Sequence, residues 1–193
     1  AVTQYRRYGY FHPLDILDDA AVAENRAYLE TFEAGQGHPL KGGQRNKSHL
    51  LFRWVDDLMR TPRILDSVED LIGPDILCWN TLFWIKEAGS ESFVSWHQDS
   101  TYWGLSGPEV VNVWLAISPA TVASGAMRIL PGTHLDGQIP HRETYNKENI
   151  LTRGQEIDDV DVDCAVDLIL EPGEVSFHHM RTIHGSQPNR SDD

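Results

Sequence analysis

The sequence has few cysteines, few basic residues and no long apolar run. Cys78 and Cys164 are the only cysteines in 193 residues, so no disulfide framework is expected and both thiols should be reduced. The 16 Lys and Arg against 29 Asp and Glu give a formal net charge of −13, which argues against nucleic acid or an anionic membrane surface as a partner. No segment approaches the ~18 apolar residues of a membrane span and no signal peptide is apparent, so we expect a cytoplasmic protein.

The first part of the chain has the pattern of short helices. Residues 1–35 predict an irregular leading segment followed by a helix over 19–34, and residues 36–48 predict a Gly-rich, locally basic loop. Apolar residues at helical spacing over 54–72 are interrupted by Pro62, which predicts two short helices rather than one. We therefore expect residues 1–74 to form the helical N-terminal part of a single domain spanning 1–193.

After residue 75 the pattern changes to short runs rich in β-branched and aromatic residues. Gly and Pro turns separate these runs, which predicts a β-sandwich or barrel over 75–193. The fold class is therefore mainly β with N-terminal helices. The expected strands lie at 76–86, 92–98, 110–118, 126–130, 166–170 and 174–179.

Nine histidines invite a search for a metal site. Non-haem Fe(II) oxygenases bind iron with two His and one carboxylate, and alternate residues of a strand face the same side. His-x-Asp or His-x-Glu occurs three times, beginning at His97, His134 and His141. His97 and Asp99 follow a strand-like run, whereas His134 follows a Pro-Gly turn and His141 lies in a charged loop. We therefore choose His97 and Asp99 as ligands.

A third ligand must come from a distant strand. His184 fits because it lies in a turn-flanked His-Gly-Ser, and His178 and His179 compete with it within a predicted strand. In the run 109–118, Asn112 and Trp114 share one face, which has the composition of a cavity wall. Ser186 lies two residues after His184 and would face the same side if that strand continues.

These motifs together resemble the phytanoyl-CoA dioxygenase family, most of all its bacterial members. The resemblance covers residues ~5–193 and rests on an ordered set of motifs: His97-Gln98-Asp99, Pro131-Gly132-Thr133-His134, Pro172-Gly173-Glu174, and His184-Gly185-Ser186 with Asn189. It implies a double-stranded β-helix, which is a jelly-roll, cupin-like barrel. It implies Fe(II), 2-oxoglutarate and O2 as cofactor and cosubstrates, with iron held by His97, Asp99 and His184.

The resemblance also implies which residues meet 2-oxoglutarate and what reaction follows. Gln98, Trp114 and Ser186 would contact it, Leu82 matches a position that lines it, and Asn112 shares the face of Trp114. The implied reaction hydroxylates a small organic molecule with release of succinate and CO2. Family halogenases have a small residue in place of the carboxylate, so the presence of Asp99 favours a hydroxylase.

One expected residue is missing from this pattern. The family binds the far carboxylate of 2-oxoglutarate with an Arg soon after the last His, and that position falls just past Asp193. We therefore expect the native chain to continue with an Arg and a closing strand. Otherwise another cation, such as Arg128 or Arg190, would have to hold the carboxylate.

Two other classes of function stay open at this point. One is a non-oxidative cupin-like enzyme or metal-binding protein that uses zinc or manganese. The other is a β-sandwich that binds a ligand without metal. The basic stretch 41–53 and the aromatic residues near the motif suit a small-molecule substrate, and the sequence indicates neither its identity nor the oligomeric state.

Overall fold

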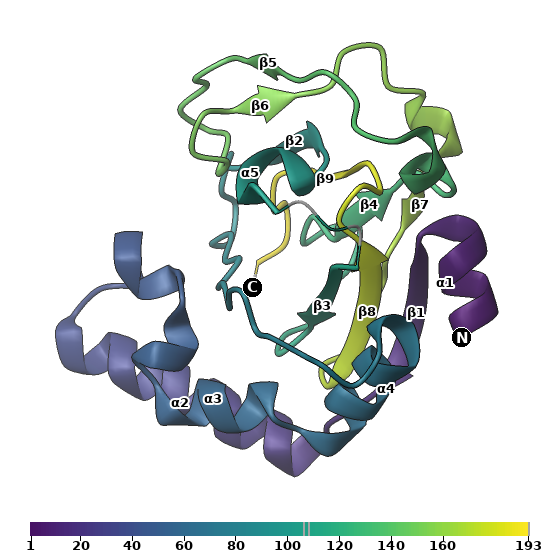
Figure 1. Ribbon diagram of the computed structural model, residues 1–193. Helices are drawn as coiled ribbons and strands as arrows, with labels where there is room; N and C mark the ends of the chain where they lie inside the picture. The colour runs from purple at the N-terminus through teal and green to yellow at the C-terminus, as the bar shows by residue number, and fades with distance from the viewer. Residues whose placement is uncertain (106, 108, 193) are drawn as a thin grey trace. The chain divides into compact units, whose positions relative to one another are not determined.

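A computed structural model describes residues 1–105, 107 and 109–192 (Figure 1). The chain divides into two compact units. The first joins Ala1–Leu14 to Lys86–Asp193, and the second is Asp15–Ile85. The expected division at residue 74 therefore differs from the observed one, since the N-terminal residues belong with the strands. Cys78 and Cys164 are both free thiols.

The second unit is helical. It contains α2 (Asp19–Gln36), α3 (Arg53–Met59) and α4 (Pro62–Ile72), with two 3-10 helices, η1 (Gly42–Arg45) and η2 (Ser48–Leu50). The Asp18 carboxylate caps α2 by accepting from the Ala21 amide at 2.8 Å, and Pro62 begins α4, where its missing N–H costs nothing. Aromatic rings pack together in this unit, namely those of Tyr28, Phe32, Phe52, Trp54 and Phe83.

The strand expected over 76–86 is wrong for most of its length. Within the described residues this run pairs only through an isolated bridge between Asn46 and Leu82. The Phe83 amide also donates to the Arg45 carbonyl at 2.9 Å. The run therefore pairs with the loop that follows α2 and adds no strand to either large sheet.

The first unit begins with an element that the sequence did not predict. Helix α1 (Val2–Tyr8) ends at Gly9, whose φ of 78° is a left-handed conformation that glycine adopts without strain. Strand β1 (Tyr10–Asp15) follows at once, and it is the edge of a three-stranded sheet in the order β1-β8-β3 (Figure 1). The leading segment expected to be irregular is thus a helix and a strand.

Strands β3 (Val111–Leu115) and β8 (Glu174–His179) form an antiparallel pair in that sheet. The register runs from Val111 opposite His179 to Leu115 opposite Val175. Alternation then puts Val175 and Phe177, both buried, on one face and Ser176 and His178 on the other. One face is apolar core, and the opposite face carries polar side chains.

A four-stranded sheet in the order β2-β9-β4-β7 makes up the other layer. It consists of β2 (Val94–His97), β9 (His184–Ser186), β4 (Met127–Ile129) and β7 (Val166–Asp167). His184 lies opposite both His97 and Ile129. This register puts two of the expected ligands side by side.

The remaining elements are short. A two-stranded sheet pairs β5 (Arg142–Glu143) with β6 (Gln155–Glu156), and three helical turns complete the unit: α5 (Ser100–Trp103), η3 (Thr133–Asp136) and η4 (Val162–Cys164). The part of the chain that the structure describes is therefore mainly β with a few helices, in three separate sheets rather than one closed barrel. None of its helices has the length and apolar character needed to cross a bilayer.

Candidate metal centre

Three side chains far apart in the sequence converge in the first unit. One ligand atom from each of His97, Asp99 and His184 lies within 4.8 Å of the others, and this is the one such group of potential ligands among the described residues. The His97 Nε2 atom is 3.4 Å from Asp99 Oδ1, and the His184 Nε2 atom is 3.6 Å from Asp99 Oδ2. Two imidazole nitrogens and a carboxylate thus surround one point.

The strands and the turn that follows them place these ligands. His97 is the last residue of β2, and its partner across the ladder is His184 at the start of β9. Asp99 is not on a strand, because its φ of −61° and ψ of −32° are helical and it precedes α5 directly. Strand alternation, the reason given for pairing Asp99 with His97, is therefore wrong, because a turn into a helix brings the two side chains together.

Both histidines are oriented by carbonyls of their own strands. His97 Nδ1 lies 2.8 Å from the Ser95 carbonyl, and His184 Nδ1 lies 2.9 Å from the Thr182 carbonyl. A carbonyl only accepts, so each Nδ1 carries the proton and each Nε2 offers a lone pair toward the cluster. Metal-bound histidines in proteins are held in this way.

Burial keeps His184 in the form that binds a metal. Removal from water, together with the nearby His97, lowers the pKa of His184 to about 3, so its imidazole is neutral at ordinary pH. His97 and His184 are only 1% and 6% exposed. Neutral, fixed and buried imidazoles fit a divalent transition metal such as iron.

Asp99 is held by the polar face of the β3–β8 pair. Asn112 Nδ2 donates to Asp99 Oδ2 at 2.6 Å, and His178 Nε2 lies 3.5 Å from the same oxygen. Burial by itself raises the pKa of the Asp99 carboxyl, but the surrounding histidines outweigh that effect and hold the pKa well below its ordinary value. The carboxylate is therefore ionised, which is the state a metal requires.

The structure separates the two histidines that competed with His184. His178 faces the cluster, with its ring centroid 4.8 Å from that of His184, and its Nδ1 atom is buried without a hydrogen-bond partner among the described residues. His179 points to the other face, where its ring lies 5.3 Å from that of His134. The contact of His178 with Asp99 is one that the sequence argument missed, although strand alternation required one of the two histidines to face inward.

Gln98 differs from its expected place. Its side chain is fully buried, and its Nε2 atom donates to the carbonyls of Gly137 and Arg181 at 2.8 Å each. Its Oε1 atom accepts from the Ile139 amide at 2.8 Å. The side-chain amide of Gln98 thus hydrogen-bonds to main-chain groups, whereas the sequence led us to expect a direct contact with 2-oxoglutarate.

The other expected cosubstrate residues occupy different surroundings. Trp114 shares the metal-facing side of β3 with Asn112 and packs against two groups of buried apolar residues, which include Ala126 and Ile129. Ser186 ends β9 on the same side as His184, and its Oγ atom accepts from Lys86 Nζ at 3.0 Å. Leu82 belongs to the helical unit and is 41% exposed there.

The remaining two histidine motifs have other partners. His134 Nε2 lies 3.1 Å from the Arg6 carbonyl. His141 Nε2 accepts from the main-chain N–H of Gln98 at 2.9 Å, and His141 Nδ1 lies 2.7 Å from the Ile139 carbonyl. Both rings thus contact main-chain groups, and neither belongs to the ligand group.

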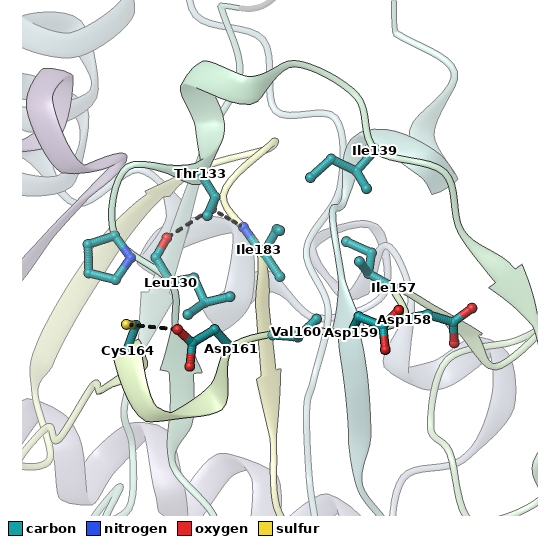
Figure 2. A pocket seen from close by; sticks show the side chains of 11 residues that line it. Leu130, Thr133, Ile139, Ile157, Asp158, Asp159, Val160, Asp161, Cys164 and Ile183 are labelled. Carbon is teal, nitrogen blue, oxygen red and sulfur yellow. Dashed lines mark hydrogen bonds between the residues drawn. The ribbon is translucent and has the colours of Figure 1, made fainter.

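A pocket of ≈ 530 Å³ lies beside the start of β9. Ile183, the residue before His184, lines it together with apolar side chains and an acidic rim at residues 158, 159 and 161. Figure 2 shows Thr133 between Leu130 and Ile183, where its hydroxyl donates to the Leu130 carbonyl at 2.8 Å and accepts from the Ile183 amide at 2.9 Å. No metal ligand lines this pocket.

Comparison with known proteins gives the family. Residues 5–193 match the family described as phytanoyl-CoA dioxygenase. The chain belongs to the phytanoyl-CoA dioxygenase family. The His97, Asp99 and His184 group offers the two imidazoles and one carboxylate that suit Fe(II).

Individual relatives agree with that membership. A probable alpha-ketoglutarate-dependent hypophosphite dioxygenase of Stutzerimonas stutzeri is 29% identical over 172 residues, which cover 88% of this chain and 59% of that protein. The non-heme monooxygenase ThoJ is 36% identical with a TM-score of 0.82, covering 99% of this chain and 72% of the other.

A third relative contributes information on the fold alone. EvdO2 of Micromonospora carbonacea, crystallised with 2-oxoglutarate, is 24% identical with a TM-score of 0.73 and covers 100% of this chain and 84% of the other. The chain shares the fold of these oxygenases, and it spans less than two thirds of the S. stutzeri protein.

Proposed function

We propose that this chain carries the catalytic centre of an Fe(II)- and 2-oxoglutarate-dependent oxygenase that hydroxylates a small organic molecule, releasing succinate and CO2. The observation that carries the proposal is the convergence of His97, Asp99 and His184, with both imidazoles held by strand carbonyls and Asp99 held by Asn112. Three protein ligands on one side of a metal leave positions for a chelating 2-oxo acid and for O2.

The protein's own groups supply geometry and a dry environment. His97, Asp99 and His184 would hold the iron, which supplies the oxidising chemistry when bound. The buried Gln98 amide ties the segment that carries both His97 and Asp99 to the carbonyls of Gly137 and Arg181, so the ligands are fixed before any substrate arrives. Trp114, Asn112 and Ser186 share the metal-facing side of their strands and are the residues that we assign to the border of the cosubstrate site.

Hydroxylation rather than halogenation is the assigned chemistry. A halide can bind iron only where the carboxylate ligand is absent, and here Asp99 is present and held by a 2.6 Å hydrogen bond. We assign Leu82 to the cosubstrate site by family resemblance alone.

The test is oxidation of 2-oxoglutarate by the full-length protein reconstituted with Fe(II). Succinate would be measured by NMR across a panel of small molecules that includes hypophosphite, the compound named for the S. stutzeri relative. Succinate formation that depends on Fe(II), O2 and one panel member supports the proposal. Tight binding of zinc or manganese, with no binding or turnover of 2-oxoglutarate, would instead indicate a non-oxidative metal enzyme.

A further inference from the structure

The pocket beside the start of β9 has an apolar interior and an acidic rim. Its volume of ≈ 530 Å³ lies within the range of cavities that bind small molecules. A ligand that displaces water from apolar side chains gains free energy. The apolar side chains that line this pocket are those of Leu130, Pro131, Ile139, Ile157, Val160 and Ile183.

Main-chain hydrogen bonds hold the isoleucines of this wall in place. The Ile139 amide donates to Gln98 Oε1 at 2.8 Å, and the Ile157 amide donates to a carbonyl of β2 at 2.8 Å. The Ile183 amide donates to Thr133 Oγ1 at 2.9 Å. Figure 2 shows the three isoleucines, which come from three separate segments, around the pocket. Because the wall is fixed before a ligand arrives, little ordering opposes binding.

The rim of the pocket carries more negative than positive charge. Three of its four consecutive residues, 158–161, are aspartates, and Asp158 pairs with Arg142 at 3.1 Å. The same guanidinium also pairs with Glu156. One arginine therefore faces two carboxylates, and it cannot neutralise both.

The other two rim aspartates have no cation beside them. Asp161 accepts from the Cys164 thiol at 3.2 Å, which supplies no positive charge, and Asp159 has no partner within the described part of the chain. Arg128 approaches the following turn, but it pairs with Asp167 at 3.1 Å. The rim thus attracts positive charge to the mouth of an apolar cavity.

We propose that this pocket is a second small-molecule site, which binds an organic cation with a short alkyl group, such as a primary alkylammonium ion. The alkyl group would pack against the isoleucine wall, and the ammonium group would stay at the rim beside Asp159 and Asp161. The same rim would repel an alkyl carboxylate. The site is independent of the proposed oxygenase function, because none of its lining residues is a metal ligand.

The experiment compares three molecules with the same six-carbon chain. Hexylammonium is positively charged, hexanol is neutral and hexanoate is negatively charged. Each would be titrated into the full-length protein and followed by NMR of 13C-labelled isoleucine methyl groups. The methyl signals of Ile139, Ile157 and Ile183 report on the pocket, whereas Ile64, which is buried in α4, reports on the helical unit.

We expect hexylammonium to shift the three pocket signals and to leave that of Ile64 unchanged. It should bind about 3- to 10-fold more tightly than hexanol, the effect of partly exposed charge pairs, and hexanoate should bind more weakly than hexanol. The double variant Asp159→Asn with Asp161→Asn should bring the affinities for hexylammonium and hexanol to within about twofold. Its matched control, Asp66→Asn with Asp70→Asn on α4, should keep the wild-type preference.

A second pair of variants tests the cavity itself. Val160→Phe places a larger side chain in the pocket and should weaken binding of hexylammonium and hexanol alike. Val122→Phe, at a position that is 67% exposed and outside the pocket, should bind both like the wild type. The methyl spectrum also shows whether each variant is folded.

Equal affinities for the three molecules, or tighter binding of hexanoate, would overturn the assignment of a cation. A preference for hexylammonium that survives in the double aspartate variant would also overturn it. Binding that leaves the pocket signals unchanged, or that Val160→Phe does not weaken, would show that the pocket is not the site. Absence of binding by all three molecules would end the proposal and leave the oxygenase assignment untouched.

Discussion

Asn112 donates a 2.6 Å hydrogen bond to the Asp99 oxygen that lies 3.6 Å from His184 Nε2. Outer partners of metal ligands typically contribute 10- to 100-fold to metal affinity. We expect Asn112→Leu to weaken binding of Co(II), used as a stable substitute for Fe(II), by about 10-fold. Titration by absorbance would measure it, with Asn25→Leu on α2 as the control. Unchanged Co(II) affinity in Asn112→Leu would show that Asp99 needs no such support.

His178 should act on the same carboxylate. Replacing it with Phe keeps a buried ring but removes the nitrogen that lies 3.5 Å from Asp99 Oδ2. We expect a smaller loss of Co(II) affinity than in Asn112→Leu. Because both residues act through Asp99, the double variant should lose less than the two separate losses combined. Strict additivity of the two free-energy changes would mean that the residues act independently.

Loss of a metal ligand should reduce metal affinity more than replacement of Asn112 or His178 does. Asp99→Ala and His184→Ala should each lower metal affinity by more than about 100-fold, the upper range for outer partners, and should abolish release of succinate. His134→Ala and His141→Ala should keep the metal, because both rings contact main-chain groups instead. Metal analysis after dialysis separates these outcomes, and retention of the metal in Asp99→Ala would contradict the ligand assignment.

The charge state of Lys86 predicts a dependence on pH. Burial lowers the pKa of Lys86 to about 8 from its ordinary 10.5, so between these values the unfolded chain holds a proton that the folded chain has released. The free energy of unfolding should therefore rise with pH across that window for the wild type relative to Lys86→Met. Urea unfolding of both proteins at several pH values would measure the difference. If the free energy of unfolding had the same pH dependence in the wild type and in Lys86→Met, burial would not lower the pKa of Lys86.

Gly125 tests how tightly this region is packed. Its φ is +72°, and a Cβ atom placed on it would collide with the Gln187 carbonyl and with Lys86 Nζ. Gly132 also has a positive φ, of +86°, but nothing lies within 4 Å of its Cβ position. We expect Gly125→Ala to lower the free energy of unfolding by more than about 1 kcal/mol, and by clearly more than Gly132→Ala. Thermal unfolding of both variants would show whether the collision, rather than the backbone conformation, sets the cost.

The sequence predicted the helices and strands that depend on residues close together in the chain. The helix after Asp18, the helix boundary at Pro62 and the strand around Asn112 and Trp114 follow from capping, proline geometry and alternation, and the structure confirms them. The strand-like run before His97 and the turn-flanked His-Gly-Ser at His184 pointed to residues that the structure brings together with Asp99.

Features that depend on pairing between distant segments were missed. Strand β1 becomes a strand because it aligns with β8. In the part of the chain that the structure describes, the apolar run 76–86 pairs only with the loop near Asn46. The choice between His178 and His179 depends on which face of β8 meets the metal ligands. Lys86, next to a Glu-Ala-Gly turn, has the sequence context of a solvent-exposed lysine, and only the fold shows its contacts with Gly125 and Ser186.

The ionised Asp99 has a consequence for the order in which the site is filled. The empty ligand group carries the negative charge of this carboxylate. A divalent metal held by one carboxylate and two imidazoles would carry one net positive charge instead. The site should therefore repel an anion before the metal is bound and attract it afterwards, so an anionic cosubstrate is expected to bind second.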